Sequence, residues 1–259
     1  MDQLLRATAA AEARHFWFRG FRAFVTPLVE LALARASDAR VLDCGCGTGA
    51  NVAWLDAYGR AYGFDLTEVG LRIGLEQGRT RLARASVTAV PFPSAAFDLV
   101  TSFDVLYALE DPDERRAIAE MYRLLRPGGH AIINVAAMTL LRGDHSAFGG
   151  EVRRYHRGEL RAHLEAAGFT IVRLTYTNAT LFGPLAISRS WQRLRGLRQE
   201  RERQRDIVVP PGPINALMTA ALRLEARWVR WFDAPFGSSL LCLARKPIHP
   251  PPVPISTPA

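Results

Sequence analysis

Short apolar runs alternate with amphipathic stretches along most of this chain. The apolar runs have the length and composition of buried strands, and they predict strands at 41–43, 61–65, 81–86, 97–103, 131–135, 169–176 and 239–246. Apolar residues spaced three and four apart predict helices at 1–36, 51–58, 112–125, 157–167 and 214–232, with another starting near residue 66. This alternation predicts a mainly parallel sheet with helices on both faces.

Local signals mark both ends of the helix predicted at 112–125. Asp111 is expected as its N-cap, Pro112 at its first position, and Glu114 as the residue that completes a capping box. The Pro-Gly-Gly sequence at 127–129 is expected to end the helix.

The helix predicted at 214–232 separates apolar from basic side chains. Its apolar residues share one face, namely Leu217, Ala221, Leu224, Trp228 and Trp231, and the arginines Arg223, Arg227 and Arg230 lie elsewhere. In one interpretation the helix covers a closed pocket for an apolar small molecule, and Trp228 is buried. In the other, the Arg-rich helix rests on an anionic membrane surface.

Size and charge narrow the possible classes of protein. The chain has 259 residues, 49% of them hydrophobic, which suffices for one α/β domain with a sizeable core. Its 33 basic and 25 acidic residues leave a net charge of +8, which is typical of proteins that contact nucleic acid or an anionic membrane. Most of the basic residues are arginines, however, as in proteins from GC-rich bacteria, so base composition also accounts for much of this charge.

The cysteines and the N-terminus favour a cytoplasmic enzyme. Cys44, Cys46 and Cys242 do not suggest a disulfide framework, and Cys44-x-Cys46 lacks the second ligand pair that a zinc site needs. The N-terminus lacks the charged and apolar segments of a signal peptide. We find no stretch of about 20 apolar residues that would span a membrane.

An acid and three glycines follow the first predicted strand. Asp43 ends the strand, and Gly45, Gly47 and Gly49 stand at alternate positions before the next helix. Glycine suits a turn in which the backbone takes positive φ and lies close to a ligand. Dinucleotide-binding turns have the spacing G-x-G-x-x-G. The spacing G-x-G-x-G with a preceding acid favours a cationic ligand over a pyrophosphate.

A second acid, Asp65, ends the next predicted strand. An acid at this position can accept hydrogen bonds from the hydroxyls of a ribose. Alternatively, Asp65 is a surface residue that caps the following helix.

The sequence VLDCGCGTG at 41–49 resembles motif I of the class I S-adenosylmethionine (SAM) methyltransferases. The resemblance covers roughly residues 10–176 and the last strand. It implies a Rossmann-like sandwich with a seven-stranded, mainly parallel sheet and an antiparallel last strand. Residues 178–238, between strands six and seven, lie outside the resemblance and are expected to form a helical insertion. The resemblance also implies SAM as the cofactor, S-adenosylhomocysteine as its product, and a small-molecule acceptor, as in the bacterial small-molecule enzymes of this family.

The same resemblance implies a set of cofactor-binding residues in the glycine turn, at the strand ends and in the N-terminal segment. They are Asp43, Cys44, Gly45, Gly47, Gly49, Asp65, Leu66, Ser86, Val87, Phe103, Trp17 and Arg19. Ser86 stands where the family usually has Asp to bind the adenine amine, and a hydroxyl binds it more weakly. Arg19 would meet the SAM carboxylate, and Trp17 or Phe16 the sulfonium. The alternative for these residues is ordinary packing of an N-terminal helix pair.

The candidate catalytic residues lie in loops and near the fourth strand. Small-molecule members of the family often have VLEHLED after this strand, whereas this chain has VLYALED, so the family's His is missing. Tyr107 is either a substrate contact or a packed aromatic. His145 is the first candidate base and His15 the second. Catalysis by positioning alone is also possible, because the SAM methyl group has a good leaving group.

The polar loop at 138–156 follows the fifth predicted strand, at the edge of the sheet where ligands bind. Four other residues of this loop are expected to face substrate or, alternatively, solvent: Asp144, Arg153, Arg154 and Tyr155. We expect no metal site.

The expected layout is a methyltransferase domain at 1–246, with a helical lid at 1–36, a substrate cover or membrane contact at 178–238, and a Pro-rich tail at 247–259. The alternatives are a methyltransferase acting on nucleic acid or on a lipid-linked acceptor, and an NAD-type oxidoreductase. Glutamates interleaved with the arginines at 189–205 and the lack of an RNA-binding module disfavour nucleic acid. The glycine spacing disfavours NAD. The oligomeric state stays open.

Overall fold

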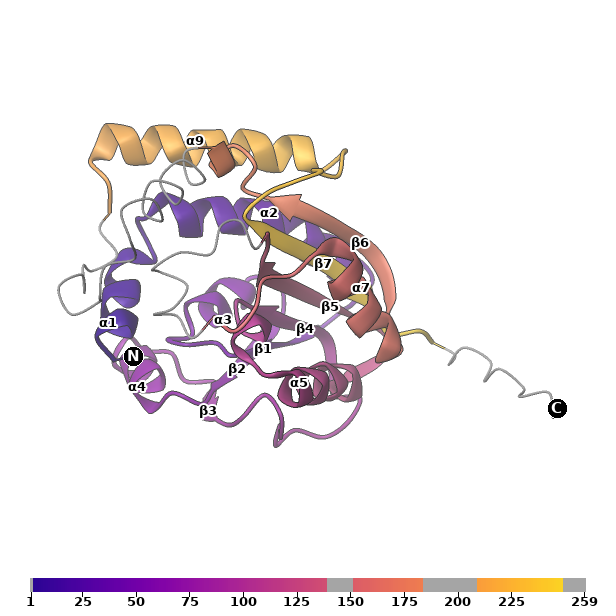
Figure 1. Cartoon of the computed structure of the whole chain (residues 1–259). Helices are drawn as coiled ribbons and strands as arrows, with labels where there is room; N and C mark the ends of the chain where they lie inside the picture. Colours follow the sequence, from indigo (N-terminus) through magenta and orange to yellow (C-terminus); the bar gives the residue numbers. More distant parts are fainter. Residues whose placement is uncertain (1, 139–150, 184–208, 249–259) are drawn as a thin grey trace, which may run out of the picture.

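The computed structural model describes residues 2–138, 151–183 and 209–248. Within these ranges seven strands form one sheet in the order β3-β2-β1-β4-β5-β7-β6 (Figure 1). The strands are β1 (Arg40–Cys44), β2 (Arg60–Asp65), β3 (Leu82–Arg84), β4 (Phe97–Phe103), β5 (Leu125–Ala136), β6 (Thr170–Thr177) and β7 (Ser239–Arg245). β7 is antiparallel to both of its neighbours, and the other neighbouring strands are parallel. The predicted Rossmann-like fold is therefore confirmed.

Helices cover both faces of the sheet. They are α1 (Asp2–Ala11), α2 (Phe16–Leu33), α3 (Ala50–Leu55), α4 (Glu68–Glu76), α5 (Asp111–Leu124), α7 (Arg157–Ala166) and α9 (Gly212–Val229), with a 3-10 turn, η1 (Leu106–Ala108). α2 and α5 pack on β4 and β5 from opposite faces, and α9 lies across the outside of α2 (Figure 1). No helix in the described ranges is long and apolar enough to cross a lipid bilayer.

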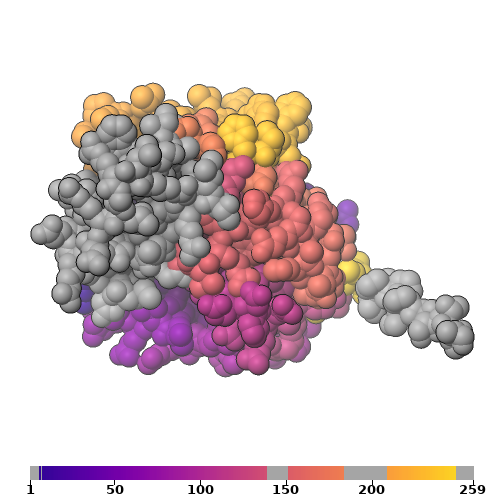
Figure 2. Space-filling model, viewed as in Figure 1, coloured from indigo at the N-terminus to yellow at the C-terminus, as the bar shows by residue number. Residues whose placement is uncertain are grey.

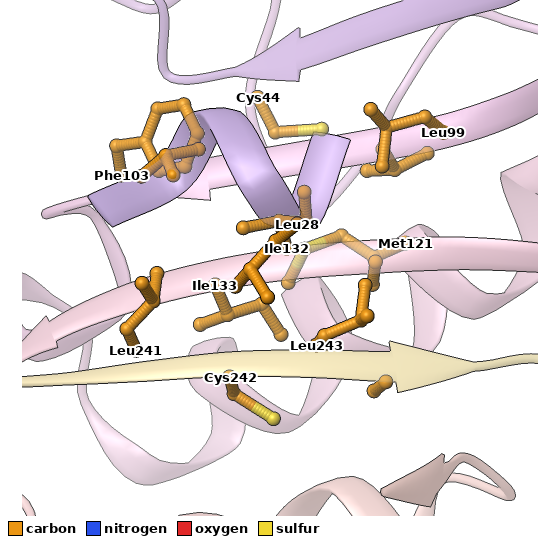
Figure 3. Packing of buried hydrophobic residues seen from close by; sticks show 14 of the residues in the cluster. Leu28, Cys44, Leu99, Phe103, Met121, Ile132, Ile133, Leu241, Cys242 and Leu243 are labelled. Atoms are coloured by element: carbon orange, nitrogen blue, oxygen red, sulfur yellow. The ribbon is translucent and has the colours of Figure 1, made fainter. Parts of the chain in front are cut away.

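The hydrophobic core is centred on β4, β5 and β7 (Figure 3). Leu99, Ile132 and Leu243 in these strands are completely buried. Leu28 of α2 and Met121 of α5 pack against them. This core fixes the ends of the parallel strands, where the residues of the predicted site lie.

α5 lies within one residue of the predicted range at each end, but the predicted capping residues are wrong. Its N-cap is Glu110, and Glu114 is a buried residue that binds side chains from a later part of the chain. A buried carboxylate gains more from these charged and phenolic donors than from one backbone N–H at a solvated helix end. α5 ends at Leu124, and the chain continues directly into β5. The Pro-Gly-Gly sequence at 127–129 therefore lies inside that strand.

The inward face of α9 is also not the predicted one. Leu217, Leu224 and Trp228 are 71%, 68% and 48% exposed, so the prediction of a buried Trp228 is wrong. The buried residues on this helix are Asn215, Thr219, Leu222, Glu225, Ala226 and Val229. A Cβ atom on Gly20 of α2 would lie 2.3 Å from Leu222 Cδ1. This missing side chain lets the two helices approach closely, with the apolar stripe of α9 facing outward.

Candidate active site

The glycine turn after β1 adopts the conformation that the sequence predicts. Gly45, Gly47 and Gly49 have φ of +80°, +56° and +77°. A Cβ atom on Gly45 would lie 2.3 Å from Val105 Cγ2, so only glycine lets this turn pack against the segment after β4. A Cβ atom on Gly47 would meet no atom of the described residues within 4 Å. Among these residues the turn therefore packs against the protein at Gly45 and is uncrowded at Gly47.

Asp43 holds a buried carboxylate that its surroundings satisfy only in part. Its Oδ1 accepts a 2.7 Å hydrogen bond from the hydroxyl of Thr101, whereas its Oδ2 has no hydrogen-bond partner among the described residues. Burial raises the pKa of Asp43 to about 7, and the nearby charge of Asp65 adds to this shift. A buried acceptor without a donor is costly, so its presence here indicates a site for a donor that comes from outside the protein.

Asp65, at the end of β2, binds the glycine turn from the neighbouring strand. Its Oδ2 accepts a 2.8 Å hydrogen bond from the backbone N–H of Gly47, and its Oδ1 accepts one of 2.8 Å from Thr67. The second bond orders the turn before α4, whose N-cap is Thr67 and not Asp65. Each carboxylate oxygen keeps a second lone pair that can accept a ligand hydroxyl. Next to it, the apolar side chain of Leu66 is 65% exposed.

The remaining predicted cofactor residues near these strands differ in their availability to a ligand. Ser86 follows β3, and its hydroxyl is shared with that of Thr88 at 2.8 Å. Val87 is half-buried against the core. The side chain of Cys44 is buried in the core, so only its backbone can meet a cofactor (Figure 3). For all of these residues, cofactor contact stays a prediction.

The N-terminal segment lies against the glycine turn. The hydroxyl of Thr48, within the turn, donates a 2.9 Å hydrogen bond to Glu12. Arg79 donates a 2.6 Å bond to the backbone carbonyl of Thr48. Further along, Phe21 of α2 makes an edge contact of 4.9 Å between ring centroids with Phe103, the last residue of β4. The segment predicted to act as a lid therefore contacts the ends of the strands that carry the site.

His15 begins α2 and acts as its N-cap. Its Nδ1 accepts a 3.2 Å hydrogen bond from the backbone N–H of Trp17, and burial lowers its pKa. Trp17 is half-buried, and Arg19 is exposed with no ion pair to any described residue. The roles proposed for these three residues stay predictions.

Asp104, which the sequence reasoning did not select, lies at the end of β4. The strand order reverses between β1 and β4, and ligands of such sheets bind at this position. Its Oδ1 accepts a 2.9 Å hydrogen bond from the side chain of Asn134, and its backbone has a φ of +60°. Asp104 as a residue is exposed, whereas its carboxyl group lies among protein atoms that desolvate it and raise its pKa to about 6. An acid directly after the fourth strand was the signal that could have identified it.

Tyr107 lies in η1, close to Asp104. Its carbonyl accepts hydrogen bonds from the N–H groups of Val152 and Arg153, which attach the segment after residue 150 to this turn. Burial and the nearby charge of Asp104 raise the pKa of its phenol. The phenol therefore stays protonated at neutral pH and is a hydrogen-bond donor.

Three residues that were predicted to face substrate or solvent instead bind protein groups and fix the segment that begins at residue 151. Arg154 forms a two-bond ion pair with Glu151, of 2.6 and 2.8 Å, and Tyr155 is completely buried. Arg153 binds Glu114 and the carboxylate of Asp111. The prediction that Arg153 and Tyr155 face substrate is wrong. Both side chains are directed at the buried carboxylate of Glu114 and at backbone carbonyls. Asp144 and His145 lie outside the described residues.

The family model described as a methyltransferase domain matches residues 42–133 of this chain, from β1 to β5. This range includes the glycine turn, Asp43, Asp65 and Asp104. The chain carries a class I SAM-dependent methyltransferase domain. SAM is accordingly the cofactor of its family.

The curated relatives of this chain match it over only part of their own length. A probable SAM-dependent methyltransferase of Mycolicibacterium smegmatis is 27% identical over 161 residues, 61% of this chain and 60% of that protein. A malonyl-[acyl-carrier protein] O-methyltransferase of Enterobacter lignolyticus is 35% identical over 112 residues, 41% of this chain and 40% of that protein. The chain thus spans about half the length of these relatives.

A solved structure supports the fold of the methyltransferase domain. Phosphoethanolamine N-methyltransferase 2 of Haemonchus contortus, in complex with SAM, superimposes with a TM-score of 0.60 at 15% identity. The superposition covers 95% of this chain and 57% of that one.

Proposed function

We propose that this chain binds SAM where β1, β2 and β3 end and transfers its methyl group to a small-molecule acceptor beside Asp104. The proposal rests on the buried Oδ2 of Asp43, which has no hydrogen-bond donor among the described residues, in the strand that leads into the glycine turn. When bound, SAM supplies an electrophilic methyl group on a sulfonium with a neutral leaving group.

The described residues fit each part of SAM. The ammonium of its methionine part is a donor that matches Asp43, whose carboxylate would ionise on binding it. Asp65 has acceptor capacity left for the ribose hydroxyls. The exposed side chain of Leu66 offers an apolar surface for the adenine ring, and the hydroxyl of Ser86 lies at the end of the next strand.

Asp104 is the residue that we propose to act on the acceptor. The side chain of Val105, the next residue, lies close to Gly45, so Asp104 follows β4 in a segment that adjoins the glycine turn. With a pKa of about 6, it is mostly ionised at neutral pH and still basic enough to accept a proton. It would bind an acceptor hydroxyl or amine and remove its proton as the methyl group transfers. The phenol of Tyr107 provides a hydrogen-bond donor nearby.

A small-molecule or carrier-bound acceptor is supported by the relative that is named for malonyl-[acyl-carrier protein]. We also propose a cytoplasmic location, because Cys44, Cys46 and Cys242 are unpaired, as expected in a reducing compartment.

Calorimetry tests the cofactor directly. The protein should bind SAM and S-adenosylhomocysteine and should not bind NAD. Protein that is folded by circular dichroism but does not bind SAM would overturn the proposal. The acceptor can then be sought by incubating the protein with methyl-labelled SAM and fractions of small molecules. Asp104→Asn serves as the matched control, because it should bind SAM normally but transfer little label.

A further inference from the structure

The outward face of α9 is apolar along its whole length. Leu217, Leu224 and Trp231 are 71%, 68% and 80% exposed, and the ring of Trp228 stacks on that of Phe232 with 5.6 Å between centroids. Leu217, Leu224 and Trp228 belong to α9, and Trp231 and Phe232 follow directly after its end. These five residues are here named the α9 stripe, and α9 forms one edge of the molecule, drawn in orange at the top of Figures 1 and 2. Large exposed apolar stripes of this kind mark interaction surfaces.

Polar contacts from the inner side hold this helix in place. Glu225 accepts hydrogen bonds of 2.7 and 2.9 Å from the N–H groups of Ala179 and Thr180. Asn215 binds the first turn of α2, accepting a 2.8 Å hydrogen bond from the N–H of Phe16. These bonds orient α9 with its apolar stripe outward.

The aromatic end of the helix is held by Arg173 of β6. This guanidinium donates to the terminal carbonyls of Val229 and Arg230, the latter at 3.1 Å, and pairs with Asp233 at 3.1 Å. Because the backbone is already ordered there, binding through the stripe would cost little conformational entropy.

The charge next to the stripe is positive. Arg223, Arg227 and Arg230 are exposed and, at spacings of four and three, line one edge of it. The acid in α9, Glu225, is 7% exposed and faces inward. The next acid, Asp233, is paired with Arg173. The outward surface of α9 is therefore both apolar and cationic.

We propose that the α9 stripe docks on an anionic membrane surface, with its apolar side chains at the level of the lipid headgroups. Helices that lie in this interface combine an apolar stripe, aromatic residues and basic flanks. Arginines near such a surface are attracted to its anionic lipids. The rings of Trp228 and Trp231 suit this boundary, since they have an apolar body and a polar N–H.

A second copy of the chain fits this face less well. In a two-fold pair the same surface meets itself, so the three arginines of each copy would approach those of the other. No acid on the outward face of α9 would compensate them. An anionic lipid surface neutralises the same arginines.

Docking would hold the proposed active site near the bilayer. α9 packs on α2, and α2 in turn contacts the end of β4 through Phe21 and Phe103. The docking itself involves no cofactor residue. It can therefore be tested whether or not the chain transfers methyl groups.

Co-sedimentation with lipid vesicles tests the charge. Wild-type protein should sediment with phosphatidylcholine vesicles that contain phosphatidylglycerol, and binding should weaken as salt is added. The triple variant R223Q/R227Q/R230Q should bind about 100-fold more weakly. The matched control R72Q/R115Q/R116Q removes the same charge from α4 and α5, on the other side of the molecule in Figure 1. This control should bind nearly as well as wild type.

Two tryptophan substitutions test the apolar stripe. W228S/W231S should keep the wild-type melting temperature, because these side chains are exposed, but should lose most vesicle binding. Brominated lipid should quench the tryptophan fluorescence of wild type and should quench that of the tryptophans remaining in W228F/W231F much less.

Three results would overturn the proposal. They are no sedimentation at low salt, equal losses in both arginine variants, and a dimer in solution that W228S/W231S separates into monomers.

Discussion

Two buried carboxylates in this protein have opposite surroundings. Glu114, a residue of α5, accepts hydrogen bonds of 2.7 Å from Tyr155 and 2.9 Å from Arg153, and its carboxylate lies 2.8 Å from a ring nitrogen of His163 in α7. Asp43, at the end of β1, receives one hydrogen bond, from Thr101, and its second oxygen has no partner in the described part of the chain.

The difference separates a structural carboxylate from one available to a ligand. At Glu114 the protein supplies every donor, so the carboxylate joins α5, α7 and the segment before α7. At Asp43 the missing donor destabilises the protein alone, and natural proteins keep such groups mainly where a ligand completes them. Asp104 is intermediate, because it has one protein donor and is exposed as a residue. The three positions make different predictions for stability, turnover and binding.

The largest effect is expected at Glu114. Glu114→Ala would leave Arg153, Tyr155 and His163 without their buried partner, and breaking such a pair costs about 3–5 kcal/mol of unfolding free energy. Urea denaturation measures this loss. The exposed neighbour Glu110, replaced by Ala, should change stability by no more than about 0.5 kcal/mol. If both variants are equally stable, Glu114 is not the structural group described above.

The next effect concerns turnover and its pH dependence at Asp104. The folded-state pKa of about 6 means that kcat/KM should fall as the pH drops through 6, because the protonated carboxyl no longer accepts a proton. Asp104→Asn should be slower by about 10²-fold at pH 8 and should lose this pH dependence. The pH profile of methyl transfer, once an acceptor is known, provides the measurement. An unchanged profile in the variant would assign the titration to another group.

A smaller effect is expected for SAM binding at Asp43. Asp43→Asn removes the charge that would bind an ammonium, so affinity should weaken by about 1.5–3 kcal/mol. Calorimetry at pH 8 tests this, and Asp98→Asn is the control, since Asp98 lies at the opposite end of β4.

The stability of the same Asp43 variant should change with pH in a defined direction. The folded-state pKa is raised from its usual value of 3.8 to about 7, so the folded protein holds a proton that the unfolded chain releases. This contribution to stability is present at low pH and is lost as the pH rises from about 4 to 7. Without SAM, Asp43→Asn should therefore gain melting temperature relative to wild type between pH 5.5 and pH 8. A constant difference would contradict the raised pKa.

Features that depend on neighbouring residues could be predicted from the sequence. The positive φ values of Gly45, Gly47 and Gly49 follow from the residue type and the spacing. The run from Phe97 to Phe103 is a strand because it is short, rich in aromatic, aliphatic and β-branched residues, and contains a single charged residue, so it can be buried on both faces. The end of such a strand in a parallel sheet also determines where ligands bind, so the position of Asp43 and Asp65 was predictable.

Features that depend on distant partners were decided by the tertiary structure. The apolar pattern of α9 shows that the helix has an apolar face, but the partner decides whether that face is buried. Gly20 and Phe16, some 200 residues earlier, select the opposite face through Leu222 and Asn215. The free energy of that contact comes from close packing and from hydrogen bonds that the local pattern does not contain.

The same reason separates the buried carboxylates. Glu114 looked like a helix cap because its donors stand 39 to 49 residues further along the chain. The sequence by itself determined which residues could be charged, buried or turn-forming. The pKa values of Asp43 and Asp104 and the outward face of α9 depend on the number of donors and the solvent left around each group. Both are determined only when strands and helices distant in sequence pack together.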